Sequence, residues 1–150
     1  MKPTVLEVSI RDVQFGEGSQ IVLPCNIYDA SLGDDVFVGP FCEIQGGVLV
    51  GNRTRIQSHT FICELVSIGE DCFIGHGVMF INDRFRAEYS RRDKTKWEGT
   101  SLANRIRVGS NATILPVSIC SDVTIGAGSV VTRDISEPGT YAGNPARRIQ

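Results

Sequence analysis

An aliphatic or aromatic residue occupies every sixth position of this chain over a long central region. The members of the series are Leu32, Val38, Ile44, Val50, Ile56, Ile62, Ile68, Ile74 and Phe80. Neither an α-helix nor a simple β-strand produces this period, because their side chains repeat every 3.6 and every 2 residues. A fixed repeat over many units is the signature of one structural module stacked on itself. The period therefore constrains the fold before any functional motif is considered.

A second position of each repeat is also restricted. The residue four places after each of the first eight members is small or β-branched: Val36, Cys42, Val48, Thr54, Thr60, Val66, Cys72 and Val78. Turn residues lie before these positions, as in Gly33-Asp34-Asp35 and Gly69-Glu70-Asp71. Inward residues separated by turns describe short strands joined at corners. The pattern predicts an all-β protein, a single-stranded parallel β-helix of hexapeptide repeats.

Three hexapeptides make one triangular coil, so residues 18 apart are predicted to stack at about 4.8 Å on adjacent coils. In this register Ile44, Ile62 and Phe80 form one column. The series continues on both sides of this region, and two of its steps are five residues long instead of six. The further members are Phe15, Ile21, Ile27, Leu102, Val108, Ile114, Ile119, Ile125 and Val131. We expect one domain over residues 1–150, with about six coils and a C-terminal cap over residues 137–146. The period does not determine the handedness of the helix.

One segment, residues 84–101, interrupts the period and is predicted to protrude as a loop. It contains six of the 15 lysine and arginine residues of the chain, including Arg84, Arg91 and Arg92. Long irregular loops on a rigid scaffold commonly carry function. Two interpretations remain open: a solvated surface excursion, or an arm that supplies cations to a phosphorylated ligand at a neighbouring subunit.

Charge and composition argue against several classes of partner. The net charge of −2 provides no global attraction to nucleic acid or to an anionic membrane. No apolar run is long enough to span a bilayer, and the N-terminus lacks the apolar segment of a signal peptide. Among the five cysteines, Cys25, Cys42 and Cys72 fall on small inward positions. We therefore expect reduced, buried thiols in a cytoplasmic protein without a metal site.

Polar residues gather at one predicted corner, after the column of Ile62. Glu64 and Asn82 are 18 residues apart and should project from this corner on adjacent coils, and Asp83 follows at the start of the loop. Arg133 falls in the same column on a later coil. Single Asn and Asp residues at corners commonly serve turns. Their stacking at the base of the loop favours a functional site for the group.

A second corner carries both histidines of the chain. Ser58, His76, Ser110 and Ala127 fall in one column, and His59 adjoins Ser58. The histidines can contact a ligand or serve as structural residues, and the spacing does not decide between these roles. Two histidines cannot form a three-histidine metal centre, and no Ser-His-Asp triad can be read from the spacing.

Several motifs resemble the hexapeptide-repeat acyltransferases. Their general signature is present as VGSNATILP at 108–116, IGAGSVV at 125–131 and AGNPAR at 142–147. More narrowly, QSHTFICE at 57–64 and FIGHGVMFINDR at 73–84 are similar to bacterial nucleotide-sugar 3-N-acetyltransferases. The resemblance extends over nearly the whole chain and implies that the β-helix is left-handed.

The resemblance further implies a reaction. Acetyl-CoA would acetylate the 3-amino group of a dTDP- or UDP-linked amino sugar, whose own amine attacks the thioester. Acetyl-CoA would be a co-substrate, with no tightly bound cofactor, and the protein would be a homotrimer. The family's active-site residues correspond to Glu64, Asn82 and Asp83. The predicted substrate contacts are His59, His76, Arg84, Arg91 and Arg92, and the predicted acetyl-CoA contacts are Ser110, Ala127, Arg133, Arg147 and Arg148.

Two other classes of function remain open. One is an O-acetyltransferase of the same fold, in which His76 or His59 acts as general base on a sugar hydroxyl. The other is a non-catalytic β-helix that serves as a trimeric scaffold. The sequence identifies neither the nucleotide nor the sugar.

Overall fold

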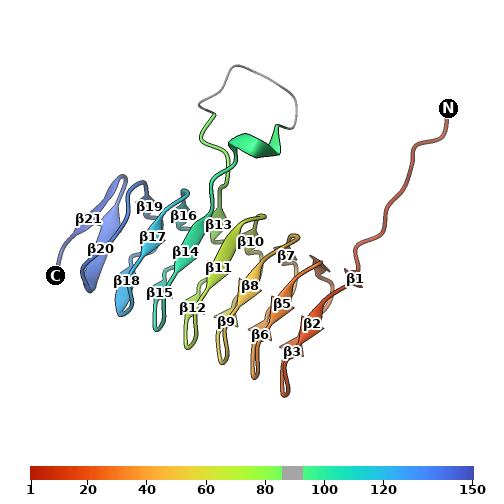
Figure 1. Ribbon diagram of the computed structural model, residues 1–150, viewed down its shortest axis with the longest axis horizontal. Coiled ribbons are helices and arrows are strands. Elements are labelled where there is room, and N and C mark those ends of the chain that lie inside the picture. The colour runs from red at the N-terminus through yellow and green to blue at the C-terminus, as the bar shows by residue number, and fades with distance from the viewer. Residues whose placement is uncertain (86–92) are drawn as a thin grey trace.

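The computed structural model describes residues 1–85 and 93–150 (Figure 1). Short strands, all but one of them of two or three residues, wind into a left-handed parallel β-helix with three sheets, A, B and C. The chain visits the sheets in the order B, C, A in each coil, and residues 1–9 extend away from the first coil (Figure 1). Among the described residues, no helix is long and apolar enough to cross a membrane.

Sheet A contains β1 (Ile10–Arg11), β4 (Asn26–Tyr28), β7 (Glu43–Ile44), β10 (Phe61–Ile62), β13 (Met79–Phe80), β16 (Thr113–Ile114) and β19 (Val130–Val131). Sheet B contains β2 (Gln14–Phe15), β5 (Ser31–Leu32), β8 (Leu49–Val50), β11 (Val66–Ile68), β14 (Thr100–Leu102) and β17 (Ser118–Ile119). Sheet C contains β3 (Gln20–Ile21), β6 (Phe37–Val38), β9 (Arg55–Ile56), β12 (Phe73–Ile74), β15 (Arg107–Val108), β18 (Val123–Ile125), β20 (Gly139–Gly143) and β21 (Ala146–Arg148). All pairs are parallel except the terminal β20–β21 hairpin.

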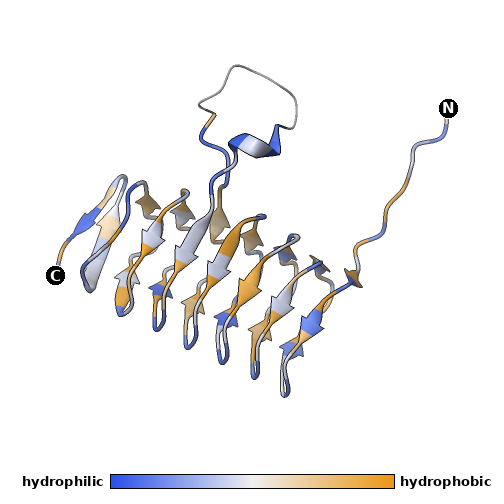
Figure 2. Cartoon of the chain, viewed as in Figure 1, coloured by the Kyte–Doolittle hydropathy of each residue, from blue (hydrophilic) through white to orange (hydrophobic). Residues whose placement is uncertain are grey.

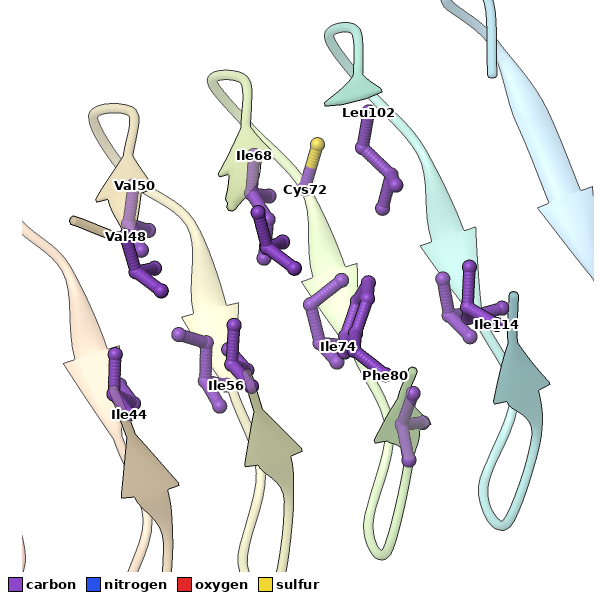
Figure 3. Packing of buried hydrophobic residues seen from close by; sticks show 14 of the residues in the cluster. Ile44, Val48, Val50, Ile56, Ile68, Cys72, Ile74, Phe80, Leu102 and Ile114 are labelled. Atoms are coloured by element: carbon purple, nitrogen blue, oxygen red, sulfur yellow. The ribbon is translucent and has the colours of Figure 1, made fainter. Parts of the chain in front are cut away.

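The predicted register is confirmed. Ile62 pairs with Ile44, and Phe61 pairs with Met79, which places Phe80 over Ile62. These columns point into the interior between the three sheets, where Ile44, Ile74 and Phe80 are labelled in Figure 3. Apolar residues recur in the strands of successive coils (Figure 2). The hydrophobic period therefore forms one continuous core.

The N-terminal end holds one strand more than the six coils expected from the sequence. Strand β1 pairs Ile10 with Ile27, so sheet A has seven strands. The sequence analysis began the series at Phe15 and did not include Ile10, which is one-third exposed at the end of the core. A strand at the end of the helix carries a weaker apolar signal because it has a neighbour on one side only.

The small inward positions are filled as predicted, and their polar groups are paired. Thr54 Oγ1 donates to a carbonyl of the next coil at 2.8 Å, and Thr60 Oγ1 donates to another at 3.0 Å. All five cysteines are free thiols: Cys25, Cys42, Cys63 and Cys72 are buried, and Cys120 is half-buried. Burial raises the pKa of both Cys42 and Cys63 to about 11.

The corner between sheets B and C has a structural role. The Asp34 amide donates to Asn52 Oδ1 on the next coil at 2.9 Å. Arg53 Nε lies 2.7 Å from Asp71 Oδ1, and this hydrogen bond lowers the pKa of Asp71. Asp71 adopts φ 55°, a left-handed turn conformation that Asp tolerates. The charged turns of this corner thus tie successive coils together.

The protruding loop ends earlier than predicted. Strand β14 begins at Thr100, which pairs with Val66 of β11, so the predicted boundary at residue 101 is two residues too long. Thr100 is buried and its hydroxyl donates to Leu115 O at 3.3 Å. Because Thr100 is polar, the sequence pattern did not identify it as an inward-facing residue of a strand.

Candidate functional site

The turn between sheets A and B, here the A–B corner, brings Glu64 and Asn82 together. Asn82 Nδ2 donates a 3.2 Å hydrogen bond to the main-chain oxygen of Glu64, 18 residues earlier. The Glu64 side chain is 24% exposed, so its carboxylate is partly shielded from water. Asp83 is the next residue after Asn82, at the start of the loop. The stacking expected from the sequence is therefore present.

Asp83 turns the chain into the loop. Its Oδ1 accepts a 2.7 Å hydrogen bond from the Phe85 amide, two residues later. This short-range bond fixes the orientation of the carboxylate at the base of the loop, as Asx turns commonly do. Glu64, Asn82 and Asp83 thus supply two carboxylates and one carboxamide to the same corner.

The returning limb of the loop contacts this corner. It contains the 3₁₀ helix η1 (Lys94–Lys96), whose N-terminus is capped by Asp93. Lys94 Nζ lies 2.7 Å from Glu64 Oε1 and 5.3 Å from the centroid of the Trp97 ring. These contacts were missed in the sequence, where only the basic composition of the loop could have pointed to them.

Arg84 holds the base of the loop. Its Nε lies 3.1 Å from Glu98 Oε2, and its guanidinium also donates to the carbonyl of Pro116. The side chain is only 17% exposed. The sequence predicts that Arg84 binds substrate, and in this structure its guanidinium contacts Glu98 and Pro116. Arg91 and Arg92, the other predicted loop contacts, lie outside the described residues.

The turn between sheets C and A, here the C–A corner, carries both histidines. Main-chain bonds stack the predicted column: the Gly77 amide donates to Ser58 O at 3.0 Å, and the Asn111 amide donates to His76 O at 2.8 Å. His59 and His76 are exposed. The His59 ring lies 5.0 Å from the Phe41 ring, centroid to centroid.

Ser110 and Ala127, predicted to contact acetyl-CoA, continue the C–A corner on the following coils. The Gly128 amide donates to Ser110 O at 2.9 Å, which stacks these two turns. The Gly143 amide donates to Ser129 Oγ at 3.1 Å and ties the C-terminal hairpin to the same coil. This corner therefore runs as a ridge from the histidines toward the hairpin.

The predicted arginine contacts do not gather in one place. Arg133 is exposed at the A–B corner, on a different edge from Ser110 and Ala127. Arg147 and Arg148 lie on β21, where Arg147 is exposed and Arg148 pairs with Glu137 at 3.0 Å. Arg133 belongs to the same coil as Ala127 but lies at another corner of it, whereas Arg147 and Arg148 lie on β21, beyond β20, which pairs with β18 of that coil.

The two corners lie at opposite ends of the strands of sheet A. His76 precedes β13, and Asn82 follows it. Within one chain, the structure therefore separates the histidines, Ser110 and Ala127 from the group at the A–B corner. Among residues 1–85 and 93–150, no group of three His, Cys, Asp or Glu residues could hold a metal ion.

Comparison with known solved structures supports the fold. AntD, an N-acyltransferase from Bacillus cereus, superposes with a TM-score of 0.81 at 22% identity, over 91% of this chain and 83% of that one. Perosamine N-acetyltransferase from Caulobacter crescentus gives 0.65 at 19% identity, over 93% and 54%. The polySia-specific acetyltransferase NeuO gives 0.60 at 25% identity, over 92% and 69%.

Curated relatives share the repeats over part of their length. The bifunctional protein GlmU of Streptococcus uberis is 30% identical over 152 residues, which cover 93% of this chain and 32% of the relative. GlmU of Neisseria meningitidis serogroup C is 34% identical over 109 residues, which cover 72% and 22%. This chain thus spans about a third or less of these relatives.

Two family descriptions match successive parts of the chain. The bacterial transferase hexapeptide (six repeats) matches residues 29–64. The hexapeptide repeat of succinyl-transferase matches residues 65–79 and 105–133. Together these matches cover more than half of the sequence and follow the same coils that the structure shows. The chain belongs to the bacterial hexapeptide-repeat transferase family.

Proposed function

We propose that this protein is an acyl-CoA-dependent N-acyltransferase that acts on the amino group of a nucleotide-linked sugar. The observation that carries the proposal is the A–B corner, where Glu64, Asn82 and Asp83 gather at the base of a basic loop. Membership of the hexapeptide-repeat family supports it. So do the ligands of the structural neighbours: AntD was solved with dTDP-4-amino-4,6-dideoxyglucose and coenzyme A, and perosamine N-acetyltransferase with CoA and GDP-perosamine.

The chemistry requires an unprotonated amine at the thioester. A sugar amine reaches the corner as an ammonium ion at neutral pH and must lose a proton before it attacks. Asn82 and Asp83 each offer an oxygen that orients the nitrogen, and Glu64 pairs with the ammonium and orders a water through which the proton leaves. Attack forms the C–N bond and places a positive charge on the nitrogen, which then loses a second proton. The C–S bond breaks and the departing sulfur takes up one proton, so that coenzyme A leaves as the thiol. Positioning of the two reactants supplies much of the acceleration.

The separation of the two corners favours a homotrimer. We expect the C–A corner of one subunit to face the A–B corner of its neighbour, so that His59 and His76 approach the catalytic group from the adjacent chain. Each corner carries an exposed large apolar side chain, Phe41 at 58% and Leu65 at 49%. Burial of such residues between subunits would remove apolar surface from water.

Acetyl-CoA is the expected co-substrate. In this arrangement Ser110 and Ala127 line the groove between subunits, and Arg147 approaches its phosphates from the hairpin. The exposed guanidinium of Arg147 suits this role better than that of Arg148, which is paired with Glu137.

The position of the amino group is the finer part of the proposal. The sequence resemblance predicts a 3-amino sugar, whereas the AntD ligand carries its amine at C4. A direct test is thiol release from acetyl-CoA with a panel of dTDP- and UDP-linked 3-amino and 4-amino sugars and their hydroxyl analogues. We expect turnover with an amino sugar and none with the hydroxyl analogues. Turnover with hydroxyl sugars alone would support the O-acetyltransferase, and absence of acetyl-CoA binding by calorimetry would support the scaffold.

A further inference from the structure

Lys94 forms an ion pair with Glu64 at the A–B corner. Its ammonium lies 2.7 Å from Glu64 Oε1, and the two residues are 30 positions apart in the sequence. Glu64 follows β10 in the rigid coil, whereas Lys94 belongs to η1 in the returning limb of the loop. A cation from the loop therefore contacts the carboxylate and helps to shield it from water.

The group that Lys94 presents is of the same chemical class as the expected substrate. Both are primary ammonium ions on an aliphatic carbon, with three N–H donors suited to a carboxylate. Two ammonium ions cannot both hold Glu64 Oε1 at 2.7 Å without strong mutual repulsion. Binding of one at this oxygen therefore disfavours binding of the other there.

We propose that Lys94 is a positioning residue that competes internally with the substrate: it fills the ammonium-binding place beside Glu64 in the empty protein, and the amine of the sugar displaces it. This inference rests on the proposed function. In the empty protein, Lys94 keeps the Glu64 carboxylate paired and oriented toward the loop. On binding, the sugar ammonium takes over the same oxygen, next to Asn82 and Asp83.

The structure allows Lys94 to leave without releasing the loop. The lysine side chain is 60% exposed and flexible, and an exposed ion pair is weak. The base of the loop is held by separate contacts, since the Glu98 amide donates to Asn82 O at 2.8 Å and Glu98 pairs with Arg84. The Trp97 ring, 5.3 Å from Nζ, offers the displaced ammonium a cation–π contact.

Lys94→Met tests this competition, because methionine keeps the length of the side chain and removes its charge. The KM for the amino sugar should fall about two- to fivefold, the range that an exposed ion pair supplies, with kcat unchanged. Lys94→Arg restores a cation and should return KM toward the wild-type value. Lys96→Met is the matched control: it removes a charge from the same 3₁₀ helix and should not lower KM. In a Glu64→Gln background, Lys94→Met should no longer lower KM, because the carboxylate for which the two cations compete is gone.

The outcomes of these experiments distinguish failure of the inference about Lys94 from failure of the proposed function. Wild-type turnover combined with an unchanged or raised KM in Lys94→Met would overturn the role of Lys94 alone. An equal fall in KM for Lys96→Met would also overturn it, because the effect would then follow total loop charge. Absence of wild-type turnover with every amino sugar in the panel would overturn the proposed function itself.

Discussion

The side chain of Asn82 is bonded to the main chain of Glu64, across two adjacent coils, at 3.2 Å. The bond anchors the carboxamide to the rigid β-helix rather than to the loop that begins beside it. The position of the candidate site is therefore set by the stacking of coils. Loop contacts such as that of Lys94 are added to a site whose geometry the stacked coils determine.

Loss of either residue that orients the amine, Asn82 or Asp83, should strongly lower activity. We expect Asn82→Ala and Asp83→Asn each to lower kcat/KM by roughly 10²–10³-fold, by analogy with loss of one donor from an oxyanion hole. Glu64→Gln keeps the shape and one acceptor, so its effect should be smaller. Steady-state kinetics with the best amino sugar, with circular dichroism as the folding control, measures these effects. Near-wild-type kinetics for Asn82→Ala would move the site away from this corner.

His76→Ala discriminates between amine and hydroxyl acceptors. An amine can lose its proton late and to water, whereas a hydroxyl must be deprotonated as it attacks. Because His76 lies at the C–A corner, its loss should leave measurable turnover and act mainly on KM. Abolished turnover with intact binding of both ligands, measured by calorimetry, would identify the histidine as the general base and favour the O-acetyltransferase.

The register of the core can be tested at Ile62, which is fully buried between Ile44 and Phe80. Ile62→Ala should lower the free energy of unfolding by about 2–5 kcal/mol. Ile62→Asp should prevent folding, because it buries an unpaired charge. Leu49→Ala, at an exposed position in the neighbouring sheet, is the control and should have a much smaller effect in urea unfolding. A soluble, cooperatively folded Ile62→Asp protein would contradict the register.

Stability should fall at alkaline pH because of the buried thiols. Burial raises the pKa of Cys42 and Cys63 from an ordinary value of 9.0 to about 11, so the folded state keeps protons that the unfolded state releases. The free energy of unfolding is thus unaffected by these thiols below pH 9 and decreases between pH 9 and about 11. Urea unfolding across this range should show a smaller decrease for Cys42→Val, since valine fills the same inward position in other coils. An identical pH profile for that variant would refute the assignment.

Light scattering should give a mass of about 49 kDa, three times the 16.4 kDa of one chain. Phe41→Glu places a charge at the C–A corner and should shift the protein toward the monomer. Val5→Glu, in the exposed N-terminal segment, should leave the mass unchanged. A monomer at micromolar concentration in the wild-type protein would rule out the shared site.

The local hydrophobic period was sufficient to predict the coils and their register. Every inward side chain of a β-helix meets the residue one coil away, because the main-chain bonds fix the spacing between coils. The stacking of Asn82 on Glu64, and of the two histidine-bearing turns, could be predicted from the same arithmetic. The strand at Ile10 was not predicted because a strand at the end of the helix buries less apolar surface. Thr100 was not predicted to begin a strand because a polar residue fills this inward position.

The sequence by itself determined the β-helix, its core columns and the corners at which polar residues project, since these depend on a repeat that is local to the chain. Only the tertiary structure decided how the loop returns. It placed Lys94 on Glu64 and Arg84 on Glu98. The physical reason is that a loop without a period is positioned by long-range ion pairs and hydrogen bonds, and these are formed only when the folded coils bring distant residues together.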